Sequence, residues 1–245
     1  MTMSQSKPAA HAQLHDGWGE LILARPERRN ALVGPMVADL QAALTQLLAH
    51  GARAIVVRGE GGAFCSGLDV EAFGVRPAPD WVANWGTDWA DFHRQLYACP
   101  AVLIGALERY AINGGASLAL ACDLLVAGEG SYLTVGEAAL GMQAPMNTAW
   151  LRLRTSEAVM AQLALGSARA TAADLLRLGL AYRVVADATV AGDAQDLAAR
   201  LAGFPGQGLA AIKASMRQPS PGGADLFAAV QATGYQTAAP ARLAD

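Results

Sequence analysis

The sequence predicts an α/β fold with one main domain and a helical C-terminal region. Two runs, residues 53–58 with Ala-Ile-Val-Val between two arginines and residues 101–105, have the composition of strands that are buried on both faces. A glycine-containing loop follows each run along the chain, and from residue 156 onward apolar residues recur at helical spacing. A chain of 245 residues is long enough for such a fold to form a single core.

The first part of the chain predicts a strand–helix–strand unit. Residues 20–25 predict a strand that ends at Pro26, and residues 33–50 repeat apolar side chains at helical spacing until Gly51. The buried run 53–58 then completes the unit as its second strand.

The next segment, residues 77–97, is expected to be a helix with one aromatic face. Trp81, Trp85, Trp89 and Phe92 recur there at helical spacing. Such a face usually packs in a core or an interface, so we expect packing, with a wall of a substrate pocket as the alternative.

A second strand–helix–strand unit follows, and the rest of the chain is mainly helical. Residues 101–105 predict a strand, Asn113 opens a helix that runs to Cys122, and residues 123–127 return as a strand. Further helices are expected near residues 156–165, 171–178, 189–202 and 206–217, with a short strand at 182–185. The tail after Gln218 is rich in Ala, Pro and Gly and is expected to fray or to dock on a neighbour.

Composition favours an oligomeric protein that does not bind nucleic acid. Hydrophobic residues make up 53% of the chain and charged residues only 16%, so we expect apolar surface to be buried between the subunits of a homo-oligomer. The net charge of −3, with scattered arginines, provides no basic stripe for a nucleic-acid backbone. No apolar run has the length of a signal peptide core or a membrane span, which predicts a cytoplasmic protein with no membrane partner.

The cysteines and histidines show no metal-ligand spacing. Cys65, Cys99 and Cys122 are odd in number and far apart, which favours free thiols in a reducing compartment. All four histidines lie within the first 93 residues, and we expect them to be structural or solvated. His93 is the one candidate for a functional role.

Two glycine-rich loops are the candidates for chemistry. Residues 59–69 follow the first buried run and Asn113-Gly-Gly opens a helix, so both loops leave backbone N–H groups without partners. Such groups attract negative oxygen. The chain has no GKS/T or GxGxxG phosphate motif, which leaves the oxyanion of a reacting carbonyl. The alternative is that the glycines only permit tight turns between strand and helix.

Four motifs in this order resemble the signatures of the crotonase superfamily, which includes the enoyl-CoA hydratases and isomerases. They are RPERRNAL at residues 25–32, GAFCSGLD at 62–69, NGGASLALACD at 113–123 and GEAALG at 136–141. The resemblance runs from residue 14 to residue 217. Four linked motifs are far more specific than a single glycine loop.

This resemblance implies an α/β crotonase-like spiral of ββα turns with a C-terminal helical trimerisation region, assembled as a homotrimer or hexamer. The implied division is a flexible N-terminus over residues 1–13, the spiral core over 14–190 and the C-terminal helical region over 191–245. The implied substrate is an acyl-CoA thioester of fatty acid metabolism, with coenzyme A as part of the substrate. No metal and no redox cofactor is expected.

The resemblance also implies the site residues. The implied oxyanion donors are a backbone N–H group within Ser66-Gly-Leu68, where we expect that of Ser66, and the N–H of Gly114. The implied substrate-binding residues are Arg29, Ala31, Ser66, Gly67, Leu68, Asp69, Gly114 and Ser117. Arg28 or Arg29 is a candidate contact for a CoA phosphate, and the alternative is a solvated turn. Asn113 stands where the family usually has glycine, so its backbone is either left-handed or ordinary.

The chain departs from the hydratases of this family at one catalytic position. Those enzymes hold water between two glutamates, whereas here Ser117 stands at the first position and Glu137 matches the second. A hydroxyl cannot share acid-base work near neutral pH without a partner base, so one carboxylate is left to move a proton. We therefore expect an isomerase that converts 3-enoyl-CoA to 2-enoyl-CoA through Glu137, with Ser117 packing its own helix or orienting a water.

Other functions stay open at this point. A hydratase that uses Glu137 alone is the nearest alternative, followed by an acyl-CoA decarboxylase or hydrolase and by a catalytically impaired CoA-binding scaffold. The turn that ends in Ser117 also resembles the nucleophile turn of Clp-type serine peptidases. No histidine follows His93, however, so the triad cannot be built in that chain order.

Overall fold

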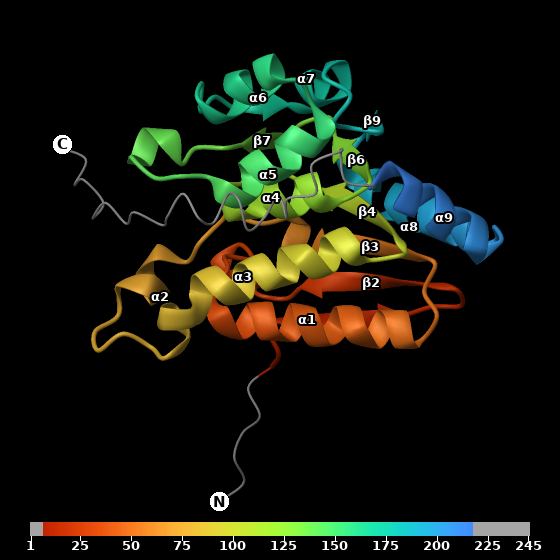
Figure 1. Cartoon of the computed structure of the whole chain (residues 1–245), viewed down its shortest axis with the longest axis horizontal. Helices are drawn as coiled ribbons and strands as arrows, with labels where there is room; N and C mark the ends of the chain where they lie inside the picture. The colour runs from red at the N-terminus through yellow and green to blue at the C-terminus, as the bar shows by residue number, and fades with distance from the viewer. Residues whose placement is uncertain (1–6, 218–245) are drawn as a thin grey trace, which may run out of the picture.

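A six-stranded sheet lies at the centre of the computed structural model, which describes residues 7–217 (Figure 1). Its strands in spatial order are β1 (Ala10–Leu14), β2 (Trp18–Leu23), β3 (Ala54–Gly59), β4 (Val102–Leu107), β6 (Leu124–Gly128) and β9 (Arg183–Val185). The first two strands form an antiparallel pair, and all other neighbours in this sheet are parallel. Parallel neighbours need crossover connections, and helices supply most of them here.

Helices cover both faces of the sheet. They are α1 (Gly34–Ala49), α2 (Val70–Gly74), α3 (Trp81–Ala98), α4 (Gly114–Ala121), α5 (Pro145–Arg154), α6 (Glu157–Ala164), α7 (Ala172–Arg177), α8 (Val190–Ala202) and α9 (Gly206–Met216). In Figure 1, α1 and α3 run side by side across β2 and β3. The opposite face of the sheet is covered by α8.

The buried strands alternate between two apolar clusters. In β3, Ile55 and Val57 pack into the cluster that contains α1 and α3, whereas Ala54 and Val56 pack into the cluster that contains α8. Successive side chains of a strand point to opposite faces, so a strand covered on both sides has no polar face. This is why β3 has the unbroken apolar sequence that predicts a doubly buried strand.

A three-stranded sheet completes the ββα order that the resemblance implies. Its strands are β5 (Tyr110–Ile112), β7 (Tyr132–Thr134) and β8 (Ala170–Thr171). Along the chain β4 is followed by β5 and α4, and β6 by β7 and α5. Two strands of the large sheet, β4 and β6, are thus each followed by a strand of the small sheet and then by a helix. The predicted α/β crotonase-like core is confirmed.

Several elements differ from the sequence prediction. β1 pairs with β2 over residues 10–14, so the prediction of a flexible N-terminus is wrong for residues 10–13. The short strands β5, β7 and β8, together with α2 and α5, were not predicted. Elements of two to five residues and the polar start of α5 carry little periodic signal.

The predicted C-terminal region divides differently in the structure. The helix α8 packs on the central sheet, although residues 191–202 were assigned to a separate region. The tail after Gln218 lies outside the described residues. Within residues 7–217, no helix combines the length and the apolar composition needed to cross a membrane.

Candidate active site

The two glycine-rich loops lie next to each other because their backbones pair like strands. Cys65 and Ala111 form a parallel bridge, in which Ile112 N–H donates to Cys65 O at 3.1 Å. Gly67, with a φ of +91°, lies so close to the second loop that a Cβ there would be 2.9 Å from Ile112 O. Only glycine fits at this position, and the first loop therefore runs along β5 toward the start of α4.

The backbone pairing decides which N–H group the first loop presents. Ser66 N–H donates to Arg29 O at 3.1 Å, so the prediction that Ser66 supplies an oxyanion donor is wrong. Leu68 forms a parallel bridge with Leu32, and Leu32 makes both hydrogen bonds of that bridge. Leu68 N–H consequently points away from Leu32, and no acceptor for it is found within residues 7–217. Of the N–H groups of Ser66 and Leu68, that of Leu68 is therefore the one without an acceptor among the described residues.

Gly114 presents a second N–H group as the first residue of α4. The first N–H groups of a helix have no acceptor within the helix, and Ser117 N–H closes the first turn on Asn113 O at 3.2 Å. Asn113 has a φ of +51° and a ψ of −114°, so its backbone is not ordinary. Its side-chain Oδ1 accepts from Gly136 N–H at 2.8 Å, which stabilises the turn.

These two loops border a cavity of about 550 Å³. Of the predicted site residues, all except Gly67 line it, namely Arg29, Ala31, Ser66, Leu68, Asp69, Gly114, Ser117 and Glu137. Trp85 and Trp89, stacked with ring centroids 5.4 Å apart, add an apolar wall. Both tryptophans are also buried in the core. The aromatic face of α3 therefore packs in the core, as predicted. It also forms a wall of the cavity, which was the alternative prediction.

Glu137 lies at the cavity with a buried carboxyl group. The residue is 8% exposed, and its Oε1 accepts from Asn147 Nδ2 at 2.9 Å. Its Oε2 has no hydrogen-bond partner among the described residues. Burial raises the pKa of Glu137 to about 7, against the opposing effect of hydrogen bonds from its own backbone and from Asn147. A carboxyl group with this pKa can both accept and return a proton near neutral pH.

Ser117, which replaces the first glutamate, belongs to a buried hydrogen-bond chain. Trp150 Nε1–H donates to His93 Nδ1 at 2.8 Å, so Nδ1 is an acceptor and the ring proton lies on Nε2. Burial lowers the pKa of His93 to about 3, which keeps the ring neutral. His93 Nε2–H then donates to Ser117 Oγ at 3.2 Å, and Ser117 Oγ–H donates to Gly114 O at 2.7 Å.

The direction of this chain excludes Ser117 as a nucleophile activated by His93. A histidine that already carries its proton on Nε2 cannot accept the serine proton through that atom. The sequence argument against a serine peptidase used the chain order of the residues. In the structure the side chains of His93 and Ser117 do contact each other. The proton on His93 Nε2 is what excludes the serine peptidase mechanism.

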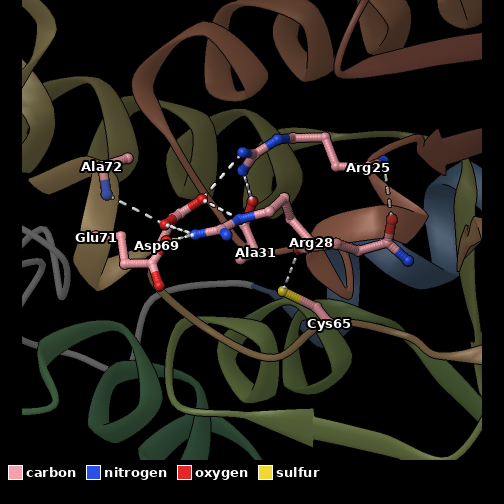
Figure 2. Close-up of polar contacts among 8 residues, drawn as sticks. Arg25, Arg28, Ala31, Cys65, Asp69, Glu71 and Ala72 are labelled. Atoms are coloured by element: carbon pink, nitrogen blue, oxygen red, sulfur yellow. Dashed lines mark hydrogen bonds and ion pairs between the residues drawn. The ribbon is translucent and has the colours of Figure 1, made fainter.

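An ion-pair cluster organises the first loop (Figure 2). Asp69 accepts from Arg25 Nη2 at 3.0 Å and from Arg28 Nη2 at 2.9 Å, and its Oδ1 also accepts from Ala72 N–H at 3.2 Å at the start of α2. These donors hold the pKa of Asp69 at about 2, with Arg28 the largest contribution. Arg28 also contacts Glu71 at 2.6 Å. The guanidinium of Arg28 thus contacts two carboxylates. In the sequence analysis, Arg28 was a candidate contact for a CoA phosphate.

Asn147 is the site residue that the sequence did not reveal. It lies in the first turn of α5, is 2% exposed and lines the cavity beside Glu137. Trp150, three residues later, contacts His93 from the same helix. Asn147 and Trp150 are three residues apart and therefore lie on the same face of α5. In the sequence, a single asparagine after Pro145 did not indicate that this face contacts Glu137.

The described residues show no candidate metal centre. Within residues 7–217, no three or more His, Cys, Asp or Glu side chains lie together as ligands would. The three cysteines are buried free thiols.

Fold and site together define a class: a ββα spiral in which the N–H groups of Leu68 and Gly114 and the buried carboxyl group of Glu137 border one cavity. Comparison with known proteins gives the family. The family model for enoyl-CoA hydratase/isomerase matches residues 15–232. The chain belongs to this family, within the crotonase superfamily, and is an enzyme of it.

Individual relatives agree with this assignment. A Rhodobacter capsulatus protein named "Probable enoyl-CoA hydratase" is 30% identical over 224 residues, which cover 89% of this chain and 86% of that protein. The 1,2-epoxyphenylacetyl-CoA isomerase of Escherichia coli is 32% identical over 79% of this chain and 76% of its own length. A Thermobifida fusca protein solved in complex with CoA has a TM-score of 0.77 and 29% identity, with 92% and 91% of the two chains covered. A putative enoyl-CoA hydratase of the same organism, solved in complex with acetoacetyl-CoA, has a TM-score of 0.77 and 28% identity.

Proposed function

We propose that the enzyme converts a 3-enoyl-CoA into a 2-enoyl-CoA, with Glu137 as the single proton carrier. The observation that carries this proposal is the pair of residues at the two catalytic positions. Glu137 is a buried carboxyl group with a pKa of about 7, whereas Ser117 is held by a neutral histidine and by Gly114 O. Glu137 can lift a proton and return it, whereas Ser117 supplies no second base at the other catalytic position.

The proposed reaction moves one proton and one double bond. The thioester oxygen accepts hydrogen bonds from Leu68 N–H and Gly114 N–H, which stabilise the negative charge that develops there. Glu137 removes a proton from C2, and the electron pair spreads over C2, C4 and the thioester oxygen as a dienolate. The same carboxyl group then delivers the proton to C4, and the double bond is left between C2 and C3.

Coenzyme A is the proposed carrier of the acyl group. Structures of Thermobifida fusca relatives hold CoA and acetoacetyl-CoA, and the cavity in this chain is bordered by Arg29 and by Asp69. Arg29 remains the candidate for a phosphate contact. The wall formed by Trp85 and Trp89 is the proposed boundary of the acyl pocket.

Hydration of a 2-enoyl-CoA is the second candidate, and one observation favours it. Glu137 Oε2 and Asn147 Oδ1 are buried acceptors without partners among the described residues. A water between them would satisfy both, and hydratase chemistry needs a held water. The hydratase names of the relatives point the same way.

The assembly and the location are also proposals. We propose a homotrimer or a hexamer, because the described surface exposes apolar residues that include Leu165, Ile212 and Met216. The buried free thiols support a reducing, cytoplasmic location.

Incubation with 3-hexenoyl-CoA and, separately, with crotonyl-CoA tests the proposal, with products followed by mass spectrometry and the position of the double bond by NMR. We expect 3-hexenoyl-CoA to isomerise without a change of mass, and Glu137→Gln to lower the rate roughly 10²- to 10⁴-fold. The control Glu129→Gln changes an exposed carboxylate outside the cavity and should leave the rate unchanged.

Other outcomes identify the alternatives. A gain of one water on crotonyl-CoA alone would make the enzyme a hydratase. Silence with both substrates, together with retained CoA binding in calorimetry, would leave a decarboxylase, a hydrolase or an impaired scaffold. Isomerisation at full rate by Glu137→Gln would overturn the assignment of the base.

A further inference from the structure

Asn147 makes two hydrogen bonds with one amide group. Its Nδ2 donates to Glu137 Oε1 at 2.9 Å and to Asn113 O at 3.0 Å. Both partners are acceptors, so the amide nitrogen must face them and the amide oxygen must point away. Both protons of the Nδ2 group are therefore committed, and the orientation of the side chain is determined.

The two partners belong to the two halves of the site. Glu137 is the carboxyl group to which the proton transfer is assigned. Asn113 O is the carbonyl oxygen of the peptide bond whose N–H belongs to Gly114. A hydrogen bond to the oxygen of a peptide group polarises it and strengthens its N–H as a donor. Asn147 thus contacts the base directly and the oxyanion donor through one peptide bond.

We propose that Asn147 is the positioning residue of this enzyme, holding the proton carrier and the oxyanion peptide in one fixed relation. This inference rests on the proposed function, since it takes Glu137 as the base and Gly114 N–H as an oxyanion donor. The catalytic geometry needs both groups aligned on one thioester, and a misplacement of about 1 Å costs roughly 10²-fold in rate.

The surroundings of Asn147 support this role. The residue is 2% exposed, so its hydrogen bonds do not compete with bulk water. The helix that carries it is anchored a turn later, where Trp150 Nε1–H donates to His93. His93 in turn acts through Ser117 on Gly114 O, the next carbonyl after Asn113 O. Two consecutive carbonyls at the start of α4 are therefore fixed from α5.

The hydrogen bond also has a direct effect on the base. The amide of Asn147 favours the charged form of Glu137 and opposes the rise in pKa that burial causes. Removal of the amide should therefore raise the pKa of Glu137 further. A residue that only fills space would not have this effect.

Two variants of matched size test the proposal. Asn147→Leu keeps the volume and removes both donors, and Asn147→Asp keeps the shape but places a second carboxylate beside Glu137. We expect kcat to fall roughly 10- to 100-fold in each with KM nearly unchanged. The acid limb of the pH profile of kcat/KM should move to higher pH in Asn147→Leu, and further in Asn147→Asp because of the like charge.

The control is the neighbouring residue on the same helix. Among the described residues, the Thr148 hydroxyl bonds to Ala144 O and Pro145 O of its own turn, and Thr148 does not line the cavity. Thr148→Val should keep both the rate and the pH profile. If Asn147→Leu does not fold, Asn147→Asp carries the test, since it keeps the size and the polarity.

A second readout isolates the oxyanion half of the proposal. Acetoacetyl-CoA has an acidic methylene group, and its enolate has a distinct near-ultraviolet absorbance. In the Glu137→Gln background, where the base is absent, Asn147→Leu should still lower the fraction of bound acetoacetyl-CoA that is enolate. Because the base is already absent in this background, a lower enolate fraction reports on the contact of Asn147 with the oxyanion peptide.

The outcomes separate the two proposals. Turnover that survives in Glu137→Gln overturns the proposed function and the inference that rests on it. If Glu137→Gln is inactive but Asn147→Leu keeps the wild-type rate and pH profile, only the positioning role is overturned. If Asn147→Leu loses rate equally at every pH and leaves the enolate fraction unchanged, Asn147 is a packing residue and the positioning role is likewise overturned.

Discussion

At the scale of single residues, the site sets two carboxyl groups in opposite environments. Asp69 is surrounded by donors, and the pKa of Asp69 is held at about 2. Glu137 is buried beside an uncharged amide, and its pKa rises to about 7. The first carboxylate is permanently charged and serves structure, whereas the second is poised to exchange a proton. The roles of the two groups follow from their neighbours and not from their residue types.

The raised pKa of Glu137 implies a cost in stability at high pH. The folded state binds the proton more tightly than the unfolded chain, whose glutamate has a pKa of 4.5. The favourable contribution is present below pH 4.5 and is lost as pH rises through about 7. Glu137→Gln should therefore raise the free energy of unfolding at pH 8 by up to about 3 kcal/mol, and by little at pH 4.5.

Urea unfolding of both proteins at the two pH values measures this difference. Glu129→Gln, a change of an exposed carboxylate, is the control for the loss of one charge. An equal gain at pH 8 and at pH 4.5 would show that the carboxyl group does not titrate in the way that its burial requires.

At the scale of elements, the active site depends on where a loop ends and a helix begins. Asp69 is the N-cap of α2, where it accepts from Ala72 N–H, and it also binds two arginines from the segment 25–28. This cluster holds the residue that follows Leu68 (Figure 2). At the second loop, Asn113 makes the turn into α4. The N–H groups of Leu68 and Gly114 therefore each lie next to a residue, Asp69 or Asn113, whose side-chain hydrogen bonds hold the backbone in place.

We expect Asp69→Asn to weaken both the fold and the binding of substrate. The side chain of Asp69 is 2% exposed, and the lowered pKa corresponds to about 2 kcal/mol of stability that is present above pH 3.8 and lost as pH falls through about 2. At pH 7 the variant should lose about this free energy of unfolding, and KM for an acyl-CoA should rise because the loop around Leu68 loosens.

Glu71→Gln is the matched control for this cluster. Glu71 contacts the same Arg28, but its side chain is 77% exposed, and solvent-exposed ion pairs contribute about 0.5 kcal/mol or less. Denaturant unfolding and substrate titration of both variants make the comparison. Equal effects of the two substitutions would contradict a structural role for Asp69.

At the scale of the whole molecule, burial is very uneven. The central sheet is covered on both faces, and α9 is held against it by Lys213, which lies 2.7 Å from Asp123 and donates to Ala101 O at 2.6 Å. The outer side of α9 nevertheless exposes Ile212 and Met216, one turn apart. An apolar stripe on a firmly docked helix is typical of a surface that another subunit covers.

Light scattering coupled to size-exclusion chromatography tests the proposed assembly. We expect a mass that is three or six times the 25.3 kDa of one chain. Ile212→Glu should shift the population toward smaller species, because a charge would have to be buried at the contact. Gln207→Glu adds the same charge at another exposed position of α9 and should not change the mass. A monomer at micromolar concentration would contradict the proposal.

The sequence by itself determined the parts of this protein that depend on local pattern. The strand runs at residues 53–58 and 101–105 and the two glycine loops were identifiable, because period and turn chemistry are properties of neighbouring residues. The role of Glu137 came from the family resemblance. The family resemblance carried the core fold and most of the residues that line the cavity.

Only the tertiary structure decided which groups meet. Ser66 and Leu68 are equivalent in sequence terms, yet pairing with Arg29 and Leu32 leaves only the N–H of Leu68 free. The contact of Asn147 with Glu137 and that of His93 with Ser117 likewise join segments that are separate along the chain. Hydrogen-bond partners depend on three-dimensional packing and not on spacing, because the backbone offers the same donor at every residue except proline.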